Sequence, residues 1–144
     1  MKMGSFRFLD HMSDVYVEVR AENINEAFEE AGKSVFETMT DLKSIDNKGK
    51  IRVELEAEDL EALLFDWLGE LIYIFDTKNL IFSKFSLKVT EVSNNRYELT
   101  ADLFGEEFDP KKHEMEMDIK APTYSLMEII YNNDGVTLRF VLDI

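Results

Sequence analysis

The sequence predicts an α+β domain in which two main helices pack on one face of a mostly antiparallel β-sheet. Leucines and aromatic residues recur at three- and four-residue steps between Asp59 and Asp76, as in an amphipathic helix. Apolar and polar side chains alternate in 14–21 and 136–143, as in half-buried strands. The chain has 144 residues, 45% of them hydrophobic, and neither a linker nor a repeat divides it, so one domain over 1–144 is expected.

The first half of the chain is predicted to contain two strands, a helix and a third strand. A short strand is expected at 3–9 and a longer one at 14–21, where three valines share a face. A helix is expected over 24–41, because the period becomes helical there and Asn23 can cap the first turn. After a loop, alternation predicts a strand over 51–57 with one acidic face.

The second half is predicted to contain the central helix over 59–76 and then a series of strands. Short clusters of turn residues separate these strands, and Asn132-Asn133-Asp134-Gly135 is a strong hairpin signal. The predicted strands are 80–90, 96–104, 113–120, 124–131 and 136–143.

The composition limits the classes of partner and site. Thirty acidic and 16 basic residues give a net charge of -14, which disfavours direct nucleic-acid binding and favours a basic protein or metal ions. The absence of cysteine excludes disulfides, thiolate zinc sites and cysteine nucleophiles. No signal-peptide core and no long apolar run occurs, so no membrane association is expected and the protein is predicted to be soluble and cytoplasmic.

No residue is predicted to be catalytic. The motifs GxxxxGK(S/T), GxGxxG, HExxH and GxSxG are all absent. His11 stands three residues before Asp14, a spacing compatible with a shared ligand, an orienting hydrogen bond, or a turn histidine bonded to the main chain. His113 follows Lys111 and Lys112 and is predicted to lie in a solvated loop.

Strand geometry places carboxylates at one end of the predicted sheet. Asp14 begins one strand and Asp143 ends another, each on the face opposite the apolar residues. If these strands are antiparallel neighbours, both carboxylates come to the same end, where the α-carboxylate of Ile144 adds a third. Such carboxylates repel one another unless a hard cation bridges them, so they are either a Ca²⁺ or Mg²⁺ site or, as is common for acidic residues at strand ends, exposed and solvated.

Two other charged features have two interpretations each. Lys120 ends an alternating run just before Pro122, so it is either solvated or a cation that balances a nearby acidic cluster. The acidic strand face of Glu54, Glu56 and Glu58 is either solvated or a docking surface for a basic partner.

The chain resembles the archease family in an ordered set of blocks that covers nearly all of it. The blocks are Phe8-Leu9-Asp10-His11-Met12-Ser13-Asp14-Val15, Asp59-Leu60-Glu61-Ala62-Leu63-Leu64-Phe65-Asp66-Trp67-Leu68, Gly105-Glu106-Glu107-Phe108-Asp109-Pro110-Lys111-Lys112-His113, Lys120-Ala121-Pro122-Thr123-Tyr124 and Leu142-Asp143-Ile144. Each block is weak by itself, but their order and spacing are specific.

The resemblance implies an accessory protein of the RtcB-type RNA ligase, which joins tRNA halves after intron removal. The ligase carries out the chemistry, and the archease promotes its guanylylation and multiple turnover and can broaden its nucleotide use. The resemblance also implies calcium binding by Asp14, Asp143 and Ile144, with Mg²⁺ or Mn²⁺ as other candidates, and a functional role for Lys120.

The chain departs from the family pattern at two places, and two other functions remain open. Met12-Ser13 stands where Thr-Ala is usual, and Pro122 replaces an aliphatic residue beside the functional lysine. One alternative is a metal-dependent hydrolase with His11 or His113 as base. The other is a general chaperone or binding module.

Overall fold

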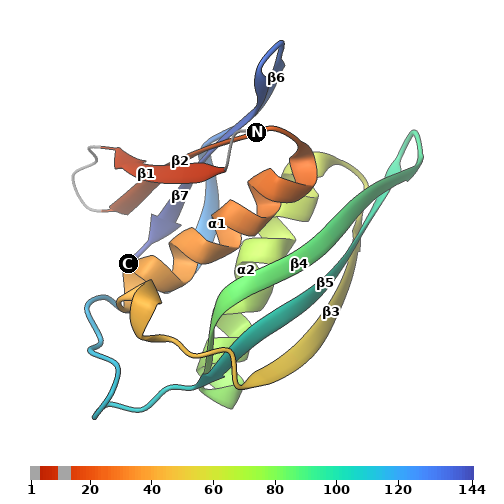
Figure 1. Cartoon of the computed structure of the whole chain (residues 1–144). Helices are drawn as coiled ribbons and strands as arrows, with labels where there is room; N and C mark the ends of the chain where they lie inside the picture. The colour runs from red at the N-terminus through yellow and green to blue at the C-terminus, as the bar shows by residue number, and fades with distance from the viewer. Residues whose placement is uncertain (1–3, 10–13) are drawn as a thin grey trace.

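The computed structural model describes residues 4–9 and 14–144, and in it two helices lie between two antiparallel sheets (Figure 1). The elements are β1 (Ser5–Leu9), β2 (Asp14–Ala21), α1 (Ile24–Met39), the short 3-10 helix η1 (Leu42–Ser44), β3 (Gly49–Ala57), α2 (Leu60–Lys78), β4 (Leu80–Ser93), β5 (Arg96–Glu107), β6 (Ala121–Asn132) and β7 (Gly135–Asp143).

The predicted α+β class is confirmed, and the helices are covered by a sheet on both sides. One sheet has the strand order β1-β2-β7-β6 and the other the order β3-β5-β4. Helix α1 contacts β2 and β4, and α2 contacts β6 and β3, so each helix touches both sheets. Helix α2 can contact two sheets because its buried residues form a band too wide for one contact face. They are Leu63, Leu64, Trp67, Leu68, Leu71, Ile72 and Ile74.

The centre of the first sheet joins the two ends of the chain. Strands β2 and β7 are antiparallel neighbours over their whole lengths. Val17 and Val19 of β2, and Leu138 and Phe140 of β7, are fully buried in the core. The alternation predicted for both strands is therefore confirmed, and the residues between these positions lie on the outer face.

Each helix begins at a side-chain cap. The Asn23 side chain accepts a hydrogen bond from the N–H of Glu26 (2.9 Å), and Asp59 accepts one from the N–H of Ala62 (2.7 Å). The second helix ends at Asn79, whose φ of 59° is the left-handed conformation common after a helix. Within the described residues no helix is both long and apolar enough to cross a membrane.

The strand predicted over 113–120 is wrong. Residues 108–120 form an irregular connection from β5 to β6. Its main chain bonds other elements at single points: Glu116 donates to the Met39 carbonyl, and Lys120 to the Asp143 carbonyl, both at 2.8 Å. Alternating apolar residues occur here because the segment is extended, but no neighbouring strand continues a ladder beside it.

Candidate functional site

Asp14 and Asp143 are directly opposed across β2 and β7. Asp14 is the first residue of β2 and Asp143 the last of β7, and the two are partners in the register. Residues opposite each other in an antiparallel pair share one face, with Cβ atoms about 4.5–5.5 Å apart. Both side chains are half-buried. The condition on which the sequence argument depended, that these two strands are antiparallel neighbours, is therefore met.

Ile144 and Lys120 lie at the same end of the sheet. The side chain of Ile144 packs against the core, which holds its main chain beside Asp143. The Asp143 carbonyl accepts the Lys120 N–H (2.8 Å), and Ala121 pairs with Asp143 in the register. The Lys120 side chain is exposed. The four predicted site residues are thus brought together, and Asp14, Lys120, Asp143 and Ile144 are here called the rim.

A cleft of about 260 Å³ adjoins the rim. Its lining residues are Phe8, Leu9, Asp14, Val15, Tyr16, Glu37, Thr38, Glu116 and Met117. Glu37 and Glu116 are acidic residues that the sequence analysis did not place near the rim. Glu37 belongs to α1, where it accepts the N–H of Leu42 (3.1 Å), and Glu116 belongs to the irregular connection. No local spacing in the sequence could have joined these positions to Asp14, because only the tertiary fold brings them together.

Asp14, Asp143 and Ile144 of the rim offer oxygen donors. Two aspartate carboxylates and the main-chain oxygens of Ile144 suit a hard cation such as Ca²⁺ or Mg²⁺. Among the residues that the structure describes, no three His, Cys, Asp or Glu side chains gather to form a metal site. Because Ca²⁺ takes about six to eight oxygen ligands, a cation held by these donors keeps positions open for water or a partner's groups.

The chain matches the model of a known protein family over nearly its whole length. The family model described as "Archease protein family (MTH1598/TM1083)" matches residues 6–144. The chain belongs to the archease family. The resemblance drawn from the ordered sequence blocks is therefore confirmed.

Relatives in the archease family match the chain from end to end. The chain is 37% identical over 142 residues to Protein archease of Sulfurisphaera tokodaii, covering 99% of this chain and 100% of the relative. It is 38% identical to Protein archease of Sulfolobus acidocaldarius, with the same coverage. It is also similar to the solution structure of Methanobacterium thermoautotrophicum protein 1598, with a TM-score of 0.84, 35% identity and 100% coverage of both chains.

His113 does not lie in a solvated loop, and that prediction is wrong. The imidazole is buried, with 1% of the residue exposed. Its Nδ1 accepts the N–H of Asp109 (2.9 Å), and its Nε2 lies 2.9 Å from Oε2 of Glu106. Because Nδ1 is an acceptor, the ring proton is on Nε2 and is donated to the carboxylate. His113 therefore fixes the irregular connection to β5 and lies outside the rim.

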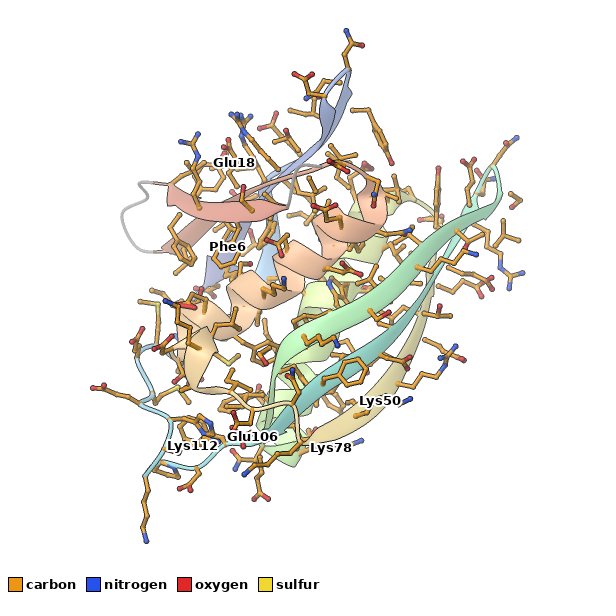
Figure 2. All side chains as sticks on the ribbon, viewed as in Figure 1. Phe6, Glu18, Lys50, Lys78, Glu106 and Lys112 are labelled. Carbon is orange, nitrogen blue, oxygen red and sulfur yellow. The ribbon has the colours of Figure 1, made fainter. Side chains whose placement is uncertain are left out.

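Glu106 is the centre of this second cluster. The Lys112 ammonium donates a hydrogen bond to the Glu106 carboxylate at 2.8 Å (Figure 2). The N–H of Asp46 donates another to the same carboxylate, also at 2.8 Å. Burial by itself raises the pKa of Glu106, but the hydrogen bonds from Asp46, Lys112 and His113 outweigh it and lower the pKa to about 2. The ionised carboxylate therefore holds one end of the connection, while the Lys120–Asp143 bond holds the other.

Glu18 supports the strands of the rim from the outer face of the sheet. It is 2% exposed, and its carboxylate accepts hydrogen bonds from Arg7 (2.7 Å) and Arg139 (2.9 Å), with Arg20 at 3.3 Å. Burial raises the pKa of Glu18, but the arginines lower it below the usual value. This cross-strand cluster joins β1, β2 and β7 in the register that pairs Asp14 with Asp143.

His11 lies outside the described residues, as do Met12 and Ser13. Its predicted relation to Asp14 therefore stays a prediction. The hydrolase alternative also used His113 as a base near the same ions. That form of the alternative loses support, because both ring nitrogens of His113 are occupied by Asp109 and Glu106.

Proposed function

We propose that this chain is a non-enzymatic accessory protein that activates an RtcB-type RNA ligase in tRNA splicing and RNA repair. It promotes guanylylation of the ligase and its repeated turnover. The observation that carries the proposal is the opposition of Asp14 and Asp143 beside Lys120, in a chain of the archease family. The rim concentrates oxygen donors and one exposed cation, which suits a role in organising the chemistry of another protein.

In this proposal the rim binds calcium through Asp14, Asp143 and Ile144. Carboxylates directly opposite on neighbouring strands repel each other, and a bridging cation removes that repulsion. Mg²⁺ or Mn²⁺ can use the same oxygen donors. The bound metal supplies positive charge that can orient phosphate oxygens, while the strand register holds the two carboxylates in place.

Lys120 has a separate task in this proposal. Its main-chain N–H bonds the Asp143 carbonyl, so its exposed side chain begins at the strand end that carries the carboxylates. A lysine in this position can contact an acidic group of the ligase or a phosphate of the nucleotide. This contact would help the ligase adopt the conformation that reacts with GTP, and would relax its choice of nucleotide.

Charge favours the encounter of the two proteins. The chain carries a net charge of -14, and an RNA-binding cleft is basic. Opposite fields accelerate association and lose strength as salt is added. The same acidic surface disfavours strong direct binding of RNA.

A guanylylation assay tests the proposal. Ligase and radiolabelled GTP are incubated with the native chain, Asp143→Asn, Lys120→Gln or the control Asp134→Asn. The control removes an aspartate charge at the exposed β6–β7 turn. Native chain and control should accelerate labelling of the ligase, and Asp143→Asn should lose most of this effect. Full acceleration by Asp143→Asn would contradict the role of the rim.

A further inference from the structure

The edge strand β6 contains a strained and exposed leucine. Its register with β7 shifts between Thr123 and Glu128, so residues 124–127 bulge out of the ladder. Leu126 in this bulge has a φ of 59° and is 51% exposed. A bulky residue is disfavoured in the left-handed region, and its exposed surface gains little from burial. Glycine or asparagine would adopt this conformation with less strain, so a leucine here suggests a task outside the isolated fold.

Tyr124 provides an aromatic platform in the same bulge. Its ring stacks on Phe65 of α2, with centroids 4.2 Å apart and planes within 2° of parallel, and the residue is 55% exposed. The stack orients the tyrosine while leaving half of it accessible. Rigid, partly exposed tyrosines are favoured anchors in protein interfaces, since they contribute a large contact area at a small entropic cost.

Carboxylates surround this platform. Burial raises the pKa of the Tyr124 hydroxyl, and the negative charges of Asp66, Asp59 and Glu58 raise it further. Burial also raises the pKa of the exposed Asp66. The apolar surface of the bulge is therefore bordered by negative charge supplied by α2 and the residues just before it.

The other end of β6 repeats this combination. Tyr131 is 61% exposed, and the pKa of its hydroxyl is raised by burial and then by Tyr97, Glu91 and Glu61. The β6–β7 hairpin that carries Tyr131 projects beyond the helices (Figure 1). Tyr124, Leu126 and Tyr131, with the carboxylates of Asp59, Glu61 and Asp66, are here called the β6 face.

We propose that the β6 face is a second docking surface, which binds a basic segment of the partner protein that carries arginine or lysine among apolar side chains. Guanidinium and ammonium groups bind tyrosine faces and pair with carboxylates, and apolar side chains of the segment cover Leu126. The bulge and Pro122 interrupt the row of main-chain groups at this edge, so the partner is recognised through side chains and adds no strand.

The inference rests on the proposed function in its choice of partner, the RNA ligase, whose surface must be basic where it binds RNA. The β6 face begins four residues after Lys120 and runs along a strand of 12 residues. At about 3.3 Å per residue that strand extends over roughly 40 Å, which is enough for a specific protein interface together with the rim. The rim then acts on the ligase reaction, and the β6 face holds the complex together.

Leu126→Gly is the sharpest test, because it separates binding from folding. Glycine accepts the positive φ, so the melting temperature of the variant should equal or exceed that of the native chain. Its affinity for the full-length ligase, measured by biolayer interferometry at fixed salt, should fall at least fivefold. The double variant Tyr124→Ser/Tyr131→Ser should lose at least tenfold. The control Met115→Ser, which removes an exposed apolar residue of the irregular connection, should bind as the native chain does.

The activity of the same variants distinguishes the two proposals. Variants of the β6 face should restore full ligase stimulation when their concentration is raised, whereas Asp143→Asn should not. Native affinity in the β6 variants, or losses no larger than that of Met115→Ser, would overturn the docking surface and leave the proposed function standing. Absence of both binding and stimulation by the native chain would overturn both.

Discussion

Asp14 and Asp143, at opposite ends of the chain, are direct cross-strand partners in the first sheet. Each is held there by its strand, since the valines of β2 and the apolar face of β7 are buried in the core. Moving either strand to separate the two aspartates would therefore expose core residues. This relationship makes the rim the place where a cation would act on both stability and function.

Calcium should stabilise the native chain, and the rim variants should lose most of this effect. A ligand at 100 times its dissociation constant adds about 2.7 kcal/mol to the free energy of unfolding. Asp14→Asn and Asp143→Asn should lose most of the calcium-induced rise in melting temperature, and Asp143→Asn should be at least as stable as the native chain in EDTA, because it removes one of the two opposed charges. Thermal melts with and without Ca²⁺ measure both effects. An equal calcium shift in all three proteins would exclude the rim as the site.

Glu106 should make stability depend on pH between about 4.5 and 2. The pKa of Glu106 is lower in the folded chain than in the unfolded chain. Its contribution to stability is therefore fully present above the unfolded-state pKa, and is lost as pH falls through the folded-state pKa. A lowering from 4.5 to about 2 corresponds to about 3 kcal/mol. Urea unfolding at several pH values should show that the free energy of unfolding falls more steeply with decreasing pH for the native chain than for Glu106→Gln. Parallel curves would show that Glu106 has no such role.

Glu18→Ala should destabilise the fold, because it leaves three arginines around an empty position. The free energy of unfolding should fall by about 1–3 kcal/mol. This is less than the cost of breaking a fully buried ion pair, because Arg7 and Arg20 are about two-thirds exposed and water can solvate them. Glu54→Ala, which breaks an exposed pair with Arg52, should cost less than about 0.5 kcal/mol. Chemical denaturation of both variants measures the difference, and similar losses would refute the cluster's role.

His113→Ala should loosen the irregular connection without unfolding the sheets. The variant loses the hydrogen bonds to Asp109 and Glu106 that fix this segment. Hydrogen exchange should quicken at the amides of Glu116 and Lys120, which bond other elements at single points. Exchange in β2 and β7 should change little. Unchanged protection in 108–120 would mean that the cluster does not hold the connection.

Much of the fold was predictable because side-chain period reports local conformation. The alternation in β2 and β7 assigned the faces correctly, and placed Asp14 and Asp143 on the outer face. The caps Asn23 and Asp59 were also predictable, since they act within one turn of their helices. These features depend on residues close together in sequence, or on one pairing between two strongly patterned strands.

Other features depend on which helices and strands contact one another, and the period of apolar side chains along the sequence does not indicate those contacts. The apolar band of α2 indicated burial but not the presence of a sheet on each side. The extended segment 113–120 has the side-chain pattern of a strand without a neighbour to pair with. His113 and Glu18 gave no local signal of burial, because the groups that satisfy them come from other turns and strands. Polar residues at such positions become predictable only with the tertiary structure.

We propose that the opposed carboxylates of the rim make this chain an activator of the ligase. The most direct measurement counts ligated RNA molecules per ligase molecule, with limiting ligase, calcium and saturating amounts of the native chain or Asp143→Asn. We expect many turnovers with the native chain and about one with the variant. Equal turnover numbers with both proteins, or no stimulation of a competent ligase by the native chain, would contradict it.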